Sequence, residues 1–182
     1  DTSIKYIDGV GNILGGAAPE RIRTNGFLPA SGRMIFDRYD VPKMIRDGEF
    51  VDVIKHEIAH VLGFASIWKE LNLTNGFKYI GNKAVSQYSS LKGWQQTYIP
   101  IEQGGGRGTK GGHWDEKVFG NENMTGYSNQ GKNPVSIMTI GAIEDLGYKV
   151  NYQKAESYSL PSNSKKLYNE NFKLIGNINN YS

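Results

Sequence analysis

The chain has 182 residues, no cysteine and a formal net charge of +3. This length is enough for one domain with its own core. The absence of cysteine excludes disulfides, thiolate metal ligands and a cysteine nucleophile. No apolar run approaches the roughly 18 residues of a membrane span, so we expect no transmembrane segment. The positive charges are dispersed, so we also expect no nucleic-acid partner.

The first part of the chain predicts short strands separated by loops. Residues 4–7 alternate weakly and stop at an Asp-Gly pair, which indicates a strand that enters a turn. The glycine-rich stretch 9–19 is interpreted as a loop. Residues 32–39 alternate more clearly and predict a better strand, which we expect to end at Asp40.

Residues 49–62 have the clearest helical pattern in the chain. Apolar residues recur there at three- and four-residue steps, which is typical of an amphipathic helix. Asp47 is the expected N-cap, and Gly63 stands where a helix-ending glycine belongs.

The second half of the chain has less regular patterns. Residues 64–112 are rich in Gly, Asn, Gln, Ser and Tyr, and predict a long irregular insertion with at most one short helix. Residues 136–147 predict a second helix, capped by Ser136 and ended by Gly147. Residues 150–182 are polar and predict an extended tail.

The strongest chemical signal is HEIAH at residues 56–60. On a helix, His56 and His60 lie on one face a turn apart, so both imidazoles can reach one zinc ion. Glu57 then lies beside the metal, where its carboxylate can take a proton from a metal-bound water. The pattern therefore predicts a catalytic zinc site with Glu57 as general base.

A catalytic zinc ion needs a third protein ligand and an open position for water. The chain has three histidines, so His113 is the one imidazole left outside the motif. It follows a glycine-dense stretch that can bend it toward the helix. A carboxylate ligand is the alternative, and Glu122 is the candidate.

Two other motif matches fail on their surroundings. Residues 106–111 have the spacing G-x-G-x-x-G, but no convincing strand precedes them and no clear helix follows. Residues 8–12 have too few oxygen ligands for a calcium loop. We therefore expect neither a dinucleotide nor a calcium site.

At these residues the sequence resembles the leishmanolysin family (M8) of metzincin zinc peptidases. Residues 56–64 are similar to that family's active-site helix, and residues 113–126 to the segment that brings its third histidine after a long insertion. Residues 136–148 are similar to the helix that follows, and residues 11–20 and 28–41 are similar to stretches upstream of the zinc helix.

This resemblance implies an α+β, metzincin-like fold with a mixed sheet, an active-site helix and a mostly irregular C-terminal subdomain ending in a helix. It implies one Zn²⁺ per chain on His56, His60 and His113. Met124 would be the methionine beneath the metal, with Met138 as the other candidate and neither as a ligand. Residues 32–39 would pair with an extended peptide or protein substrate as an edge strand, with a buried structural strand as the alternative.

The resemblance also sets expectations for the organisation of the chain. We expect an N-terminal subdomain over residues 1–63, shorter than is usual in the family, and a C-terminal subdomain over residues 64–182. We expect a monomer that is secreted or at the cell surface.

The predicted function is that of a zinc-dependent endopeptidase. The alternative from another class is a zinc-stabilised binding or adhesion module without turnover. Glu57 argues against this module, because a structural zinc site needs no general base and usually has four protein ligands. Tyr127 and Tyr148 are both candidates for a phenol near the reacting carbonyl, and the sequence does not choose between them.

Overall fold

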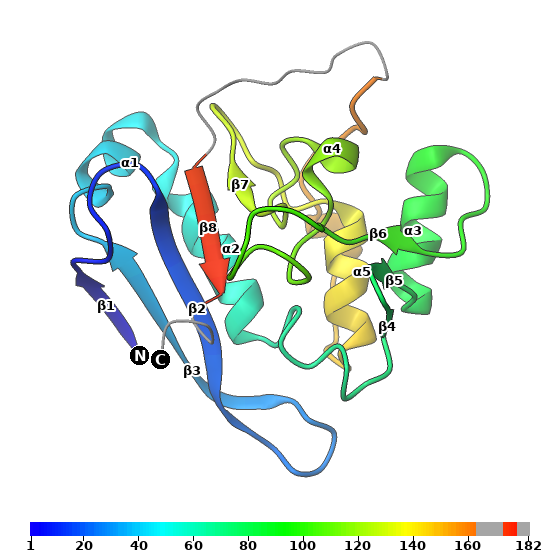
Figure 1. The fold of residues 1–182 in the computed structure, drawn as a ribbon. Helices are drawn as coiled ribbons and strands as arrows, with labels where there is room; N and C mark the ends of the chain where they lie inside the picture. The colour runs from blue at the N-terminus through cyan, green and yellow to red at the C-terminus, as the bar shows by residue number, and fades with distance from the viewer. Residues whose placement is uncertain (163–172, 178–182) are drawn as a thin grey trace.

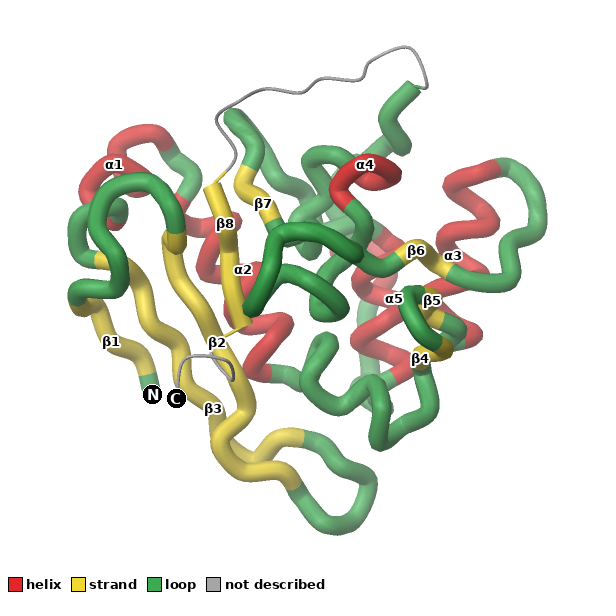
Figure 2. Tube along the Cα trace, in the orientation of Figure 1, coloured by secondary structure: helices red, strands yellow, loops and turns green. Residues whose placement is uncertain are grey.

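A computed structural model describes residues 1–162 and the backbone of residues 173–177. Strands and helices mix in an α+β arrangement, as predicted, and long loops join them (Figures 1 and 2). No helix among the described residues has the length and apolar character needed to cross a bilayer. The strands are β1 (Thr2–Lys5), β2 (Ile13–Ile22), β3 (Pro29–Asp37), β4 (Thr74–Asn75), β5 (Lys78–Tyr79), β6 (Ile99–Pro100), β7 (Tyr127–Ser128) and β8 (Lys173–Asn177). The helices are α1 (Val41–Asp47), α2 (Phe50–Val61), α3 (Asn82–Lys92), α4 (Glu116–Phe119), α5 (Ile137–Asp145) and a 3₁₀ turn (Tyr152–Lys154).

The main sheet has the strand order β1-β3-β2-β8-β7. β1 and β3 run parallel, and β2 runs antiparallel to β3. β8 runs parallel to β2 and antiparallel to β7. The prediction of an edge strand at residues 32–39 was wrong, because β3 lies between β1 and β2 and both of its backbone edges are paired.

Strand β2 corrects the prediction of a loop at residues 9–19. Its centre consists of glycine and alanine, which have low strand propensity, yet it is buried against α2. Small residues are needed on both strands because the helix approaches closely: a β-carbon on Gly15 of β2 would lie 3.2 Å from Glu57 Oε1, and one on Gly32 of β3 would lie 2.7 Å from Val61 Cγ1. Packing against the helix therefore decides the strand.

Helix α2 occupies nearly the predicted range. Asp47 is not its N-cap; it is the last residue of α1, and Glu49 takes the N-cap position without a side-chain hydrogen bond. Helix α1 was not predicted; its proline, Pro42, lies in the first turn, where proline suits a helix. Gly63, at φ 108°, turns the chain after α2 as expected.

Helices α3 and α5 pack together in the second half of the chain (Figure 1). Ser136 caps α5 as predicted, since its side chain accepts a hydrogen bond from Thr139 N. The predicted irregular insertion contains α3 and the small sheet β4-β5-β6. The predicted extended tail is described over residues 150–162; its remainder lies outside the described residues except for β8.

Two clusters of buried apolar side chains lie on the two sides of α2. The smaller one joins β2, β3, α1 and α2 through Leu14, Phe36, Val41, Met44 and Val53. The larger one joins the end of α2 to α3, α5 and the loops between them, and its largest members are Phe64, Ile67, Trp68, Tyr79, Trp114, Phe119 and Met138. Helix α2 is therefore held from both sides.

Candidate metal centre

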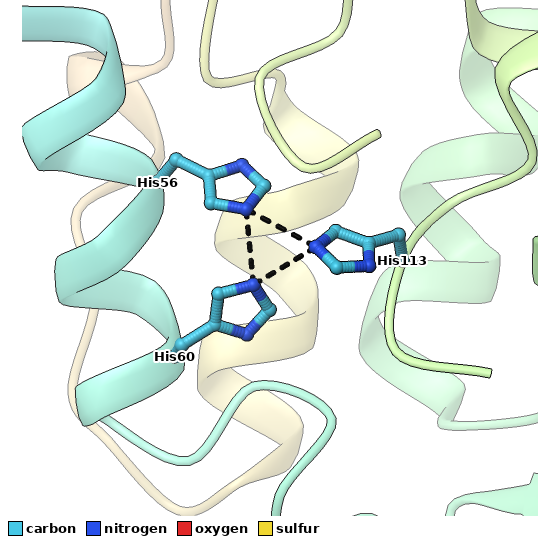
Figure 3. Close-up of side chains that lie close together, drawn as sticks. All are labelled: His56, His60 and His113. Carbon is cyan, nitrogen blue, oxygen red and sulfur yellow. Dashed lines mark hydrogen bonds between the residues drawn. The ribbon is translucent and has the colours of Figure 1, made fainter. Parts of the chain in front are cut away.

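Helix α2 presents His56 and His60 on one face, one turn apart, as the spacing predicts (Figure 3). Their ring centroids lie 4.7 Å apart, and both side chains are fully buried. The opposite, partly exposed side of the helix carries Val51 and Ile58. The motif therefore faces the interior, between the two apolar clusters.

His113 comes from a loop more than fifty residues further along the chain and points at the same place (Figure 3). Its neighbour Trp114 fixes this loop: Trp114 N donates to Met124 O at 3.0 Å, and Trp114 Nε1 donates to Thr139 Oγ1 at 2.8 Å. The Trp114 ring is fully buried and packs edge-on against Phe64, just after α2. Burial of the tryptophan thus brings His113 to the helix.

The three Nε2 atoms form a nearly equilateral triangle. The distances are 3.0 Å from His60 to His56, 3.0 Å from His60 to His113 and 3.1 Å from His56 to His113. Regular tetrahedral zinc with Zn–N bonds of about 2.0–2.1 Å separates its ligand nitrogens by about 3.3 Å. A slightly wider triangle would therefore hold zinc, with the fourth position free.

The other nitrogen of each ring identifies the tautomer. Nδ1 of each ring faces a backbone carbonyl, which accepts hydrogen bonds and cannot donate them: Asn123 O for His56 at 2.6 Å, Phe64 O for His60 at 3.2 Å, and Thr109 O for His113 at 2.9 Å. Each Nδ1 therefore carries the proton, and each Nε2 offers a lone pair. Three converging lone pairs cannot satisfy one another, whereas a cation satisfies all three.

Burial keeps these rings neutral. It lowers the pKa of His60 to about 3 and that of His113 to about 4, and repulsion from His113 adds to the shift at His60. Burial also lowers the pKa of His56 well below its usual value, helped by repulsion from the two other rings. Neutral imidazole is the form that binds a metal, so the rings are ready as ligands at neutral pH.

Glu57 follows His56 on α2 and is fully buried. Neither carboxylate oxygen has a hydrogen-bond partner among the described residues, and burial raises the pKa of this carboxyl well above its usual range. Gly15 of β2 lies against it: a β-carbon on Gly15 would be 3.2 Å from Glu57 Oε1. An unpartnered buried carboxyl is costly, which is typical of a group kept for its chemistry.

The alternative third ligand, Glu122, is occupied elsewhere. Its Oε1 accepts from Ser136 Oγ at 2.7 Å and from Thr139 Oγ1 at 2.5 Å, and its Oε2 accepts from Met124 N at 2.6 Å. Among the described residues, the group of side chains placed to hold a metal consists of His56, His60 and His113. Glu122 instead ties the start of α5 to the segment around Met124.

Both candidate methionines are fully buried. Met124 directly follows Asn123, whose carbonyl oxygen faces His56 Nδ1. Met138 belongs to α5 and the larger apolar cluster. Of the two tyrosines, Tyr148 donates its hydroxyl to Leu62 O at 3.0 Å, at the end of α2.

Several contributors to the site were missed from the sequence. The carbonyl groups of Phe64, Thr109 and Asn123 act through the backbone, so no residue type announces them. Gly15 did leave a signal, because a glycine pair inside an apolar stretch often marks a close approach of another group.

A helix with the HExxH pattern, met by a third histidine from a distant loop, defines the class of candidate metal-dependent hydrolases. Residues 25–182 match the family described as peptidase M8, leishmanolysin. The chain therefore belongs to the leishmanolysin family.

Individual relatives agree with this assignment. The chain is 33% identical over 148 residues to a leishmanolysin homolog of Crithidia fasciculata, covering 72% of this chain and 21% of that protein. Leishmanolysin-like peptidases of Caenorhabditis elegans and Caenorhabditis briggsae are each 45% identical over 58 residues, covering 31% of this chain and 8% of each relative. The chain thus spans about a fifth or less of the length of these relatives.

Proposed function

We propose that this chain carries the catalytic centre of a zinc-dependent endopeptidase of the metzincin type. One observation supports this most: three neutral imidazoles direct their Nε2 lone pairs at one point, next to an unpartnered buried glutamate. A structural zinc site usually has four protein ligands and needs no such glutamate. The arrangement therefore favours catalysis over the alternative of a binding or adhesion module.

When bound by His56, His60 and His113, zinc would supply Lewis acidity and lower the pKa of a water molecule in its open position. Glu57, in its carboxylate form, would accept a proton from the water molecule that attacks the carbonyl carbon of the peptide bond. Glu57 then passes the proton to the nitrogen of the leaving amine as the C–N bond breaks. Its buried, unpartnered oxygens suit both transfers, because no hydrogen bond competes for the proton.

The remaining features of the proposal follow from the family. Met124 is the methionine beneath the metal, and its place next to Asn123 supports this choice over Met138. The two apolar clusters support an N-terminal subdomain over residues 1–63 and a C-terminal subdomain from residue 64 onward. The substrate is an extended peptide or protein, and the enzyme acts as a monomer in the secreted or cell-surface compartment.

Replacing Glu57 with glutamine tests the proposal, because it keeps the side chain's shape and removes its basicity. We expect Glu57→Gln to retain about one zinc per chain while cleavage of an unfolded protein substrate falls at least about 100-fold. Glu70→Gln, an exposed position after α2, is the matched control and should cleave like the parent. Equal cleavage by Glu57→Gln and the parent would refute the mechanism, and so would cleavage that persists after a chelator has removed the metal.

A further inference from the structure

The candidate centre is closed to solvent although a peptidase must admit a chain to it. His56, Glu57, His60 and His113 all have 0% of their surface exposed. Whatever covers them has to move before any peptide can reach Glu57.

Strand β8 lies where an incoming peptide would pair. Glu57 lies against β2 at Gly15, and the other edge of β2 is already taken by β3. The β2 edge left for an added strand is the one that β8 occupies, with Ile13 opposite Leu174 and Gly16 opposite Gly176. Peptides commonly bind proteins by adding a strand to such an edge.

β8 lies between β2 and β7 in the main sheet (Figures 1 and 2). Its second edge pairs with β7, where Tyr127 lies opposite Leu174 and Ser128 opposite Lys173. β2 packs on the helix that carries Glu57, and β7 begins shortly after Met124. The strand therefore joins the part of the sheet that packs on α2 to the segment that follows Met124.

We propose that Lys173–Asn177 is a built-in blocking strand: its backbone occupies the β2 edge beside the histidine cluster and must leave before a peptide can be cleaved. This regulatory role rests on the proposed function. The pairing is short enough to open: it covers five residues, meets β7 at two pairs and has a register irregularity against β2.

Gly176→Pro tests the proposal because it removes a backbone N–H donor from β8. β8 is paired on both edges, and proline is excluded from such strands because it lacks the N–H donor. We expect Gly176→Pro to raise kcat/KM on an unstructured peptide about tenfold or more, if the blocked state makes up at least about nine-tenths of the parent. Ser159→Pro, in an exposed stretch outside any helix or strand, is the matched control and should behave like the parent.

A second readout needs no turnover. The chain has three histidines and all three belong to the buried cluster, so acylation of histidine by diethyl pyrocarbonate, followed by the ultraviolet absorbance of the acylated imidazole in chelator-treated protein, reports access to this cluster. We expect slow acylation in the parent and in Ser159→Pro, and fast acylation in Gly176→Pro with unchanged near-ultraviolet circular dichroism from Trp68 and Trp114. Acylation at the parental rate in Gly176→Pro would overturn the proposal, and so would faster acylation with unchanged kcat/KM. Gly176→Pro could also acylate faster while neither it, the control nor the parent cleaves peptide. This result would refute the proposed peptidase activity, and it would still support the proposal that β8 blocks access to the cluster.

If Gly176→Pro does not fold, amide hydrogen exchange on the unaltered chain still tests the proposal. The blocking strand predicts slowed exchange within Lys173–Asn177 and at the paired residues Gly16 and Ala17 of β2. Exchange within Lys173–Asn177 at the rate of an unstructured peptide would overturn the proposal.

Discussion

Gly15 of β2 and Glu57 of α2 touch across the boundary between the sheet and the active-site helix. A β-carbon on Gly15 would lie 3.2 Å from Glu57 Oε1, 2.9 Å from Ile35 O and 2.9 Å from Phe36 Cδ1. Neither the strand backbone nor the buried ring can withdraw without a shift of the sheet. The glycine thus sets the distance between the sheet and the proposed general base.

Gly15→Ala should therefore weaken both the fold and the chemistry. We expect the free energy of unfolding to fall by about 1–3 kcal/mol, as for other overpacked cores, and kcat to fall because Glu57 is displaced. Urea unfolding and peptide cleavage measure the two effects. Gly112→Ala is the control: it adds the same methyl group next to His113, but its nearest neighbour would be Ala65 Cβ at an ordinary 3.6 Å. Equal losses in the two variants would contradict the role given to Gly15.

Replacing His113 distinguishes the two candidates for the third ligand. We expect His113→Ala to lose zinc affinity by more than the roughly 10–100-fold that the loss of an outer hydrogen-bond partner costs, because a direct ligand is removed. Equilibrium dialysis against a competing chelator measures the affinity. Glu122→Gln should keep its zinc while losing stability, since a glutamine cannot accept all the hydrogen bonds that Glu122 accepts. The opposite pattern would make Glu122 the ligand.

Asn123 should orient His56 from outside the metal centre. Its carbonyl faces His56 Nδ1, and its side chain anchors that carbonyl by donating to Asp52 O at 2.9 Å and Asn133 O at 3.1 Å. We expect Asn123→Ala to lower zinc affinity about 10–100-fold, the usual cost of losing such support. The exposed Asn121, whose side chain donates to Lys132 O, is the control: Asn121→Ala should bind zinc like the parent. Parental affinity in Asn123→Ala would exclude the orienting role.

The buried carboxyl of Glu116 should make the free energy of unfolding depend on pH, independently of the metal. Burial raises its pKa to about 7 from 4.5, against hydrogen bonds from Asn129 and Thr125 that lower it. Between these two values the unfolded chain has lost this proton while the folded chain keeps it, so this group makes folding less favourable as the pH rises. The cost is about 1.4 kcal/mol per pH unit across this window, and it levels off above pH 7.

Glu116→Gln removes this titration. We expect the variant to gain stability relative to the parent as the pH rises from about 4.5 to about 7, with a constant difference on either side. Urea unfolding of both proteins at a series of pH values measures the difference, and about pH 3 is the internal reference because the carboxyl is then almost fully protonated in both states. A difference that does not change across the window would show that Glu116 ionises alike in the folded and unfolded chains.

Helix α3 shows why part of the fold could not be predicted. Its N-cap, Gly81, offers no side-chain hydrogen bond, and its sequence is rich in serine and asparagine. The cap comes from α5: Asp145 accepts from Lys83 N at 2.9 Å and from Ala84 N at 3.0 Å. Gly141 of α5 allows the two helices to meet, since a β-carbon there would be 2.8 Å from Ala84 Cα. No local window of sequence contains these partners.

The sequence by itself determined the elements whose cause is local. Helix α2 follows from its apolar period, the pairing of His56 and His60 from the helical repeat, and the start of α5 from the hydroxyl of Ser136. The sequence also limited the third metal ligand to His113 or a carboxylate, because the chain has three histidines and no cysteine.

The tertiary structure decided whatever depends on partners far apart in the chain. Burial of Trp114 brings His113 to α2, backbone carbonyls set the tautomers, and packing against α2 makes a strand of the Gly15 region. It also placed β8 along β2 beside Glu57, which composition alone did not reveal. These contacts join groups that are distant in sequence, so their free energy belongs to the assembled fold and leaves no periodic signal in any one segment.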